Sequence, residues 1–272
     1  MTSKTSGSGP PDNYTPPQQP IPTVNKVTMS DIAASLKDGF SDFLARPLMS
    51  GFFGLFYAVF GLLSVWCLIR LDAIWMIIPA ALGFPLVAPF AAAGLYEMSR
   101  RLQKGQSFGW SEIFTVMASQ RKREMGWMAF VTLFILWVWF YQFRTLLVII
   151  LQDSSFSDLD GFLNTVFFTP EGWSFLAVGT CVGALLAAVL FSVTVVAMPM
   201  LLDRDIDFVS AMVTSVRVVT ENPVVMLTWA AIITAAMLLS LIPAFLGLVV
   251  TLPILGHTTW HLYQRAVSPA ER

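Results

Sequence analysis

The longest charge-free run of the chain sets the strongest limit on its fold. Val224–Thr259 is a stretch of 36 residues without Asp, Glu, Lys or Arg, and Gly51–Ile69 is another of 19. About 20 helical residues cross the hydrocarbon core of a bilayer, so apolar runs of this length indicate transmembrane helices. Only 12% of the residues are charged, whereas a soluble domain carries about 25%. We therefore predict an all-α, polytopic integral membrane protein.

Six apolar runs predict six membrane spans. The last two are separated by little more than Ile242 and Pro243, which predicts a tight hairpin between them. The predicted spans are about Met49–Ile69, Ala73–Leu95, Gly126–Leu151, Trp173–Leu202, Val224–Leu241 and Ala244–His261.

The distribution of Lys and Arg predicts the orientation, because basic residues are retained on the cytoplasmic side of a membrane. With the N-terminus inside, all but two of the 16 basic residues fall in cytoplasmic segments, and only Arg70 and Arg144 lie near the outer face. We expect a multi-pass membrane protein with the N- and C-termini cytoplasmic.

The cytoplasmic segments that precede the odd-numbered spans share one pattern. Each places apolar side chains on one helical face and polar ones on the other, which is typical of a helix lying in the membrane interface. Each ends in a residue that is expected to break the helix before the next span. These segments are 30–47, 110–126 and 207–223, and the breakers are Pro47, Gly126 and Pro223.

The same pattern predicts the domain organisation. The six spans form three pseudo-repeated hairpins, each preceded by an amphipathic interfacial helix, in units of about 30–105, 107–205 and 207–265. Together they make a six-span membrane domain over 28–265. Residues 1–27 contain six prolines and almost no large apolar side chains, which predicts a disordered, Pro-rich cytoplasmic tail. Residues 266–272 form a short cytoplasmic tail.

The chain contains two histidines, His257 and His261, four residues apart on one face of the last predicted helix. Zinc could accept such a pair, but further ligands would have to come from elsewhere, such as Glu97 or Asp203. Trp260 stands between them, and polar aromatic residues are typical of the membrane interface. The sequence favours interfacial histidines over a metal site, and no motif predicts a catalytic residue or a cofactor.

Ionisable groups deep in a membrane are costly and often mark a ligand or ion path. Arg144, with Gln142 beside it, is the best candidate for an intramembrane ligand contact, such as an anion held within the bundle. Alternatively, Arg144 reaches the outer headgroups or pairs with an acid of the 153–171 loop. Cys67 and Cys181 are the only cysteines, and both lie in apolar segments, which favours two free thiols over a disulfide.

The basic cluster Arg121, Lys122 and Arg123 predicts contacts with anionic lipid headgroups at the cytoplasmic surface. A net charge of −1 gives no sign of a nucleic-acid partner. We therefore expect the lipid bilayer, and either a membrane-protein partner or self-association, as the interactions of this chain.

Three segments carry a resemblance to a known family. They are "SLKDGFSDFLARPLMSGFFGLFYAVFG", "PLVAPFAAAGLYEMSRRLQKG" and "VVAMPMLLDRDIDFVSAMVTSVRVVTENPVVM". Over about Val27–Arg265 the chain resembles the bacterial integral membrane family known as domain of unknown function 2189. The resemblance implies a six-span inner-membrane protein, and it implies no activity and no catalytic residue.

Three functions remain open from the sequence. The first is a non-enzymatic accessory, assembly or envelope factor that acts through lateral association with protein or lipid. The alternative is a small-molecule or lipid transporter that uses the threefold helical bundle, with a polar pocket near Arg144 and the second span. The third, a metal-dependent membrane enzyme around His257 and His261, is the least favoured.

Overall fold

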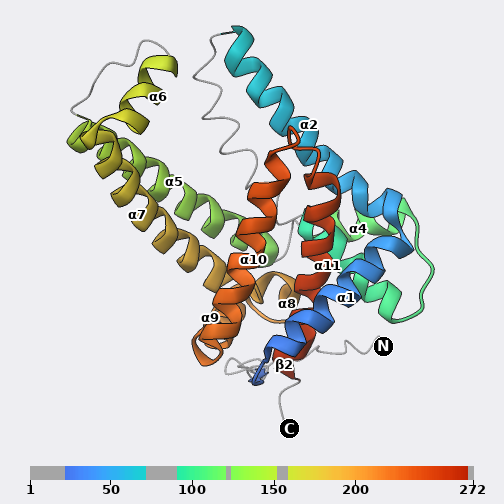
Figure 1. Cartoon of the computed structure of the whole chain (residues 1–272). Coiled ribbons are helices and arrows are strands. Elements are labelled where there is room, and N and C mark those ends of the chain that lie inside the picture. The colour runs from blue at the N-terminus through green and yellow to red at the C-terminus, as the bar shows by residue number, and fades with distance from the viewer. Residues whose placement is uncertain (1–21, 72–90, 121–123, 152–158, 269–272) are drawn as a thin grey trace, which may run out of the picture.

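The computed structural model describes residues 22–71, 91–120, 124–151 and 159–268, and in these ranges the chain is helical apart from one short two-stranded sheet (Figure 1). Residues 91–103 are also helical. The helices are α1 (Met29–Ala45), α2 (Pro47–Leu71), α4 (Trp110–Gln120), α5 (Glu124–Ile150), α6 (Leu159–Phe168), α7 (Pro170–Thr194), α8 (Ala197–Asp203), α9 (Phe208–Glu221), α10 (Pro223–Leu241) and α11 (Leu248–Ala266). The strands are β1 (Thr23–Val24) and β2 (Val267–Ser268).

Four stretches of the described residues are long and apolar enough to cross a membrane. Most of the predicted second span, Ala73–Leu95, lies outside the described residues. The predicted sixth span corresponds to α11, which is not among the four because polar side chains fill its C-terminal half. The four candidate spans are Pro47–Cys67, Glu124–Ile150, Pro170–Asp203 and Pro223–Leu241.

Two of the three predicted breakers stand at helix starts. Pro47 and Pro223 are the first residues of α2 and α10, where the missing N–H of proline costs nothing. The third prediction is wrong, because α5 begins at Glu124 and Gly126 lies inside its first turn. Glycine keeps its N–H and adopts helical torsion angles, so it does not stop a helix as proline does.

The predicted fourth span, Trp173–Leu202, is divided into α7 and α8. The break falls at residues 195–196, shortly before Pro199. In a continuous helix, the ring of Pro199 would clash with the Val195 carbonyl, and Pro199 has no N–H to donate to it. The backbone N–H of Val196 donates to the buried Ser215 Oγ of α9 at 3.1 Å, so the donor at the break is satisfied.

The turn between α10 and α11 is longer than the predicted hairpin, because α11 begins at Leu248 and not at Ala244. Ala244 and Phe245 have φ of 51° and 65°, a region that costs energy for residues other than glycine. Phe245 lies against α2, where a Cβ on Gly61 would come within 2.6 Å of its ring. The strained turn therefore places the Phe245 ring against Gly61 of α2.

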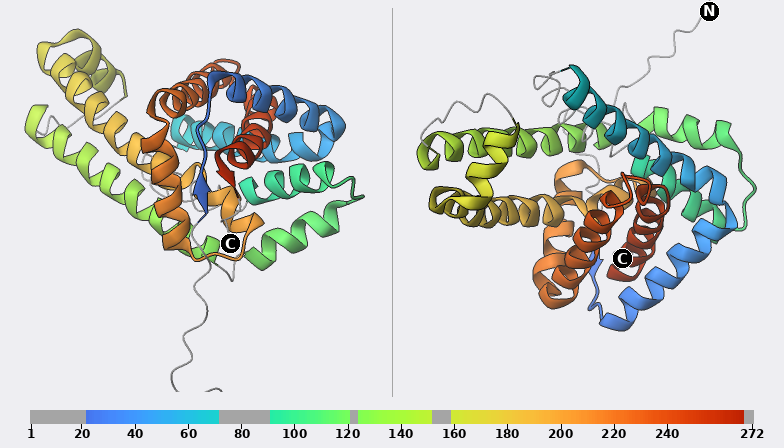
Figure 2. Two further views of the ribbon diagram at one scale, coloured as in Figure 1. Left: turned by 90° about the horizontal axis from the view of Figure 1, so that it is seen from below. Right: turned by 45° about the horizontal axis from the view of Figure 1, so that its top comes forward.

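A compact region surrounds α11, which packs against α1, α2, α8 and α10 (Figures 1 and 2). We call α1, α8, α9, α11, residues 91–103 and the small sheet the base.

Two glycines allow close packing against α11. A Cβ on Gly39 of α1 would lie 2.6 Å from the Thr258 backbone N, and one on Gly54 of α2 would lie 2.6 Å from Val249 Cα. Ile32, Ser35 and Gly39 form the buried face of α1. Phe40 and Leu44 of the same helix are exposed.

The two ends of the described chain meet in the base. β1 pairs antiparallel with β2, with Val24 opposite Val267. Asn222 Oδ1 accepts from the Val27 backbone N at 2.9 Å, and Asn222 Nδ2 donates to the Asn25 carbonyl at 3.1 Å. Residues 23–27, which the sequence analysis assigns to the disordered tail, are thus held by backbone pairing and by a buried asparagine.

A second region consists of α5, α6 and α7, which we call the arm. Figures 1 and 2 show α5 and α7 lying side by side and extending away from the base, with α6 at their far end. A small apolar cluster of Leu146, Leu151, Val166 and Phe175 packs that far end. The arm therefore has a core of its own, separate from the core of the base.

Candidate functional site

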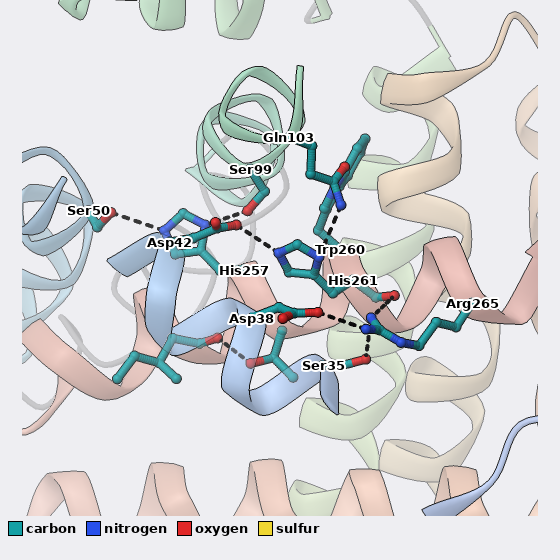
Figure 3. A network of polar contacts seen from close by, with 12 residues as sticks. Ser35, Asp38, Asp42, Ser50, Ser99, Gln103, His257, Trp260, His261 and Arg265 are labelled. Carbon is teal, nitrogen blue, oxygen red and sulfur yellow. Dashed lines mark hydrogen bonds and ion pairs between the residues drawn. The ribbon is translucent and has the colours of Figure 1, made fainter. Parts of the chain in front are cut away.

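The two histidines lie in the interior of the base and not at a wetted interface. His257 is fully buried and His261 is 5% exposed, because α1, α2 and residues 91–103 enclose this half of α11. Figure 3 shows that both rings point into the space between these elements. The expectation of interfacial histidines concerns their depth in the membrane, and it stays a prediction.

His257 is held by two serines from separate elements. Its Nε2 lies 3.0 Å from Ser50 Oγ of α2, and its Nδ1 lies 2.7 Å from Ser99 Oγ of the 91–103 helix. A neutral imidazole has one donor and one acceptor nitrogen, and a hydroxyl serves as either. The ring therefore satisfies both nitrogens inside the protein and links α2, α11 and residues 91–103.

The partners of His261 select its tautomer. The Trp260 indole N–H donates to Gln103 Oε1 at 3.0 Å, and this fixes the Gln103 amide so that its Nε2 faces His261 Nδ1 at 3.1 Å. Because an amide nitrogen only donates, Nδ1 is the acceptor and the ring proton is on Nε2. His261 Nε2 then donates to Asp42 Oδ2 of α1 at 2.8 Å.

An ion pair continues this network toward the surface. The Arg265 guanidinium lies 2.7 Å from Asp38 Oδ2 and donates to Ser35 Oγ at 3.1 Å. Its side chain also donates to the His261 carbonyl at 3.1 Å. Arg265 thus joins the end of α11 to the face of α1 that packs on it.

An open polar cavity of about 510 Å³ lies over these groups at the surface of the base. All of its lining side chains are polar or charged, and two carboxylates face one arginine there. This arrangement offers hydrogen-bond donors and acceptors to a small polar molecule. The lining residues are Asp38, Ser41, Asp42, Gln103, His261, Gln264 and Arg265.

The geometry does not assemble the metal ligands that the sequence suggested as partners for the histidines. Glu97 is ion-paired with Arg100 and Arg101 at 2.7 and 2.6 Å, and Asp203 Oδ2 accepts from the Tyr263 hydroxyl at 2.8 Å. Among the residues that the structure describes, no group of three or more His, Cys, Asp or Glu side chains could hold a metal ion.

The second predicted site lies elsewhere. Arg144 is exposed on α5 of the arm and Gln142 is half-buried there, so neither contributes to the cavity. Some of the acids in the 153–171 loop, which were expected to pair with Arg144, lie outside the described residues. The predicted lipid-binding cluster Arg121, Lys122 and Arg123 lies wholly outside them. Cys67 is buried and Cys181 exposed, and both are free.

Sequence reasoning missed the serines that pair with His257. The hydroxyls within the apolar helices behave differently: Ser64, Ser192 and Thr194 each donate to a carbonyl four residues earlier in the same helix. A signal was nevertheless present, because three pairs of polar residues share the i, i+4 spacing that places both members on one helical face. These pairs are Asp38 and Asp42, Ser99 and Gln103, and His257 and His261.

Comparison with known proteins supports the membrane assignment. The model of the family described as "Predicted integral membrane protein (DUF2189)" matches residues 77–203, a shorter range than the resemblance noted above. No curated protein and no solved structure matches the chain. Over residues 77–203 the chain therefore matches the family that the sequence resemblance predicted, a family of predicted integral membrane proteins.

Proposed function

We propose that this protein is a non-enzymatic component of the bacterial inner membrane, an accessory, assembly or envelope factor that acts by lateral association with another membrane protein. One observation carries the proposal: a row of aromatic side chains on the face of α5 that points away from the rest of the chain. We call this row the aromatic stripe, and it consists of Phe130, Phe134, Trp137 and Tyr141.

The aromatic stripe follows the spacing of one helical face. Its members are separated by four, three and four residues, so they stack along the helix. The ring centroids of Phe134 and Trp137 lie 6.1 Å apart, and those of Trp137 and Tyr141 lie 4.6 Å apart. Each side chain is at least half exposed, from 50% for Trp137 to 62% for Phe130.

The depth of the stripe favours a protein partner over lipid. Trp137 is the midpoint of α5, about 20 Å from either end at 1.5 Å per residue. Tryptophan and tyrosine usually lie at the headgroup level, where their polar atoms meet water. Neither the Trp137 indole N–H nor the Tyr141 hydroxyl bonds to another described residue, and an unpaired polar group in hydrocarbon is costly. A partner helix with acceptors at this depth would satisfy both.

The buried polar network supports a non-enzymatic role. Ser50 and Ser99 are fully buried, so a substrate has no direct access to either hydroxyl beside His257. The ring nitrogens of both histidines already have partners within the fold. In this proposal the network stabilises the base and performs no chemistry.

The topology in this proposal is six spans in three hairpin units, with an interfacial helix before each unit and both termini cytoplasmic. The pairing of β1 with β2 supports an even number of crossings, because it brings residues 23–24 beside residues 267–268. The basic residues of the cytoplasmic segments support the orientation.

A small-molecule transporter is the second candidate, favoured by the polar cavity of about 510 Å³. The cavity lies beside His261 in the base, whereas the sequence placed the transport pocket near Arg144. In the described residues, α2 continues from Ser50 as an apolar helix, so the hydrogen-bonded network does not extend along it into the membrane.

Extraction of the full-length protein in native lipid particles, without detergent, tests the proposal when it is followed by mass spectrometry. The double variant W137L/Y141L removes the polar tips of the stripe, and W66L on α2 removes an equally exposed tryptophan as the matched control. We expect a stoichiometric membrane protein, or a second copy of this chain, to be lost only from the double variant.

A partner that is retained by W137L/Y141L would overturn the stripe as the association surface. A particle free of any protein partner, but carrying a small polar molecule that is lost with Asp42→Asn, would favour the transporter.

A further inference from the structure

The face of α5 opposite the aromatic stripe borders an unfilled space. A hollow of about 290 Å³ lies between α5 and α7, and we call it the arm groove. Its lining is almost wholly apolar. Its walls include Ile135, Leu136 and Trp139 of α5, and Gly183, Leu186 and Ala187 of α7.

The groove exists although α7 carries small residues that usually let helices approach closely. A Cβ on Gly183 would lie 3.6 Å from Trp139 Nε1, which is an ordinary van der Waals contact. A Cβ on Gly179 would likewise lie 3.9 Å from Leu146 Cδ1. These glycines are therefore not required by close packing of the two helices, in contrast to Gly39 in the base.

Packed clusters close the groove at both ends. At the end far from the base, the Phe143 and Phe175 ring centroids lie 5.6 Å apart, and Phe175 belongs to the apolar cluster that includes Leu146. At the end next to the base, Met125 and Met128 are fully buried in the core of the base. The helices are thus held at their ends and leave a space between them that is open to the sides.

The surroundings of the groove identify its occupant. Both walls belong to candidate membrane spans, and Ile135–Trp139 lies near the middle of α5, so the surrounding medium is hydrocarbon. The Thr132 hydroxyl at the edge of the groove already donates to the Met128 carbonyl at 2.9 Å. Water needs about two to four polar partners, whereas the Trp139 indole N–H is the one further polar side-chain group in this lining. An empty space forfeits dispersion contacts.

We propose that the arm groove binds one acyl chain of a membrane lipid. A hollow of about 290 Å³ holds only a narrow occupant, and a flexible methylene chain can enter from the side and follow the apolar walls. The inference rests on the membrane placement of α5 and α7, and it is independent of the aromatic stripe on the opposite face.

A photoactivatable phospholipid with a diazirine at mid-chain tests this inference. The full-length protein is reconstituted into vesicles of phosphatidylethanolamine and phosphatidylglycerol containing this probe, and the cross-links are assigned to residues by mass spectrometry. We expect enriched cross-links at the groove-lining residues Ile135, Leu136, Gly183 and Leu186 relative to exposed positions on α7 such as Leu185.

Filling the groove should remove that enrichment. The variant Gly183→Leu occupies the space, while Leu185→Phe adds similar bulk to the exposed face as the matched control. The milder Gly183→Ala should reduce the groove cross-links in part and keeps the test valid if Gly183→Leu does not fold.

Even labelling of all exposed faces of α5 and α7, or groove labelling that Gly183→Leu leaves unchanged, would overturn the inference. The variant W137L/Y141L should leave the groove cross-links intact, which separates a failure of this inference from a failure of the proposed lateral association.

Discussion

Two helix pairs, α1 with α11 in the base and α5 with α7 in the arm, pack in opposite ways. In the base, α1 lies so close to α11 that a Cβ on Gly39 would come within 2.6 Å of the Thr258 backbone. In the arm, α5 and α7 stand apart, and a Cβ on Gly183 would meet nothing closer than 3.6 Å. The base therefore completes its packing internally, whereas the arm leaves space for molecules of the membrane.

The polar groups of the two regions differ in the same way. His257, His261 and Gln103 in the base find hydrogen-bond partners from other elements of the chain. Trp137 and Tyr141 in the arm are exposed, and their polar side-chain atoms have no hydrogen-bond partner among the described residues. The base satisfies its polar groups within the chain, whereas the arm has an open groove and an exposed row of aromatic side chains. This difference is consistent with a protein whose arm contacts lipid and a partner.

The largest expected contrast is between two glycine substitutions. Gly39→Ala should lower the free energy of unfolding by about 3 kcal/mol, because the obstacle is backbone and the helices must separate. Gly183→Ala should leave it unchanged or raise it by up to ~1 kcal/mol, because alanine is the better helix former and the space is free. Thermal unfolding in lipid nanodiscs measures both, and equal losses would contradict the difference in packing.

Removal of a buried histidine should have the next largest effect. His257→Phe keeps an aromatic ring at this position but leaves Ser50 and Ser99 without their partner, which should cost about 2 kcal/mol. Gln142→Leu in the arm should change stability by less than ~0.5 kcal/mol, because this residue belongs to no buried network. The same unfolding assay compares them, and a harmless His257→Phe would show that the network does not stabilise the base.

The smallest contrast concerns the helix N-caps. Hydrogen bonds from Ser210, through its side chain and its backbone, lower the pKa of Asp207 at the start of α9. Because the folded-state pKa is lowered, this stabilisation is present above the ordinary carboxyl pKa of about 4 and is lost as the pH falls through the lowered value. Thr169, which caps α7 in the arm through Gly172 N at 3.0 Å, has no such titration.

Asp207→Asn keeps the cap without a titratable group, so it should resemble the wild type at neutral pH. Below about pH 4 it should become the more stable protein, by up to ~1 kcal/mol. Thr169→Ala should cost a similar amount at every pH. Unfolding measured across this acid range checks both, and a pH-independent difference between Asp207→Asn and the wild type would refute the role of the carboxylate.

Much of the helical arrangement could be predicted from local signals. Long apolar runs located α2, α5 and α10, and Pro47 and Pro223 marked two helix starts, because these features act within one helix. Gly126 misled the prediction, since glycine weakens a helix without removing a hydrogen bond. The division of the fourth span at residues 195–196 also depends on a partner from another element, the Ser215 hydroxyl.

The candidate site was less predictable for the same reason. The spacing of His257 and His261 was visible in the sequence, but their burial depends on α1 and residues 91–103, which lie far away along the chain. The interfacial assignment used the local pattern around Trp260, whose indole N–H bonds to Gln103 in the interior. Polar pairs with matching spacing on separate helices are a better indicator of such a network than the histidines alone.

Hydrogen exchange, read by mass spectrometry in native-lipid particles and again after complete replacement of the lipid by detergent, tests the contrast between base and arm most directly. We predict that the amides of α1 and α11 keep their protection in both media. The amides of α5 and α7 around the arm groove should lose protection when the lipid is removed. Equal changes in the two regions, or an arm that is unaffected by the loss of lipid, would contradict the account.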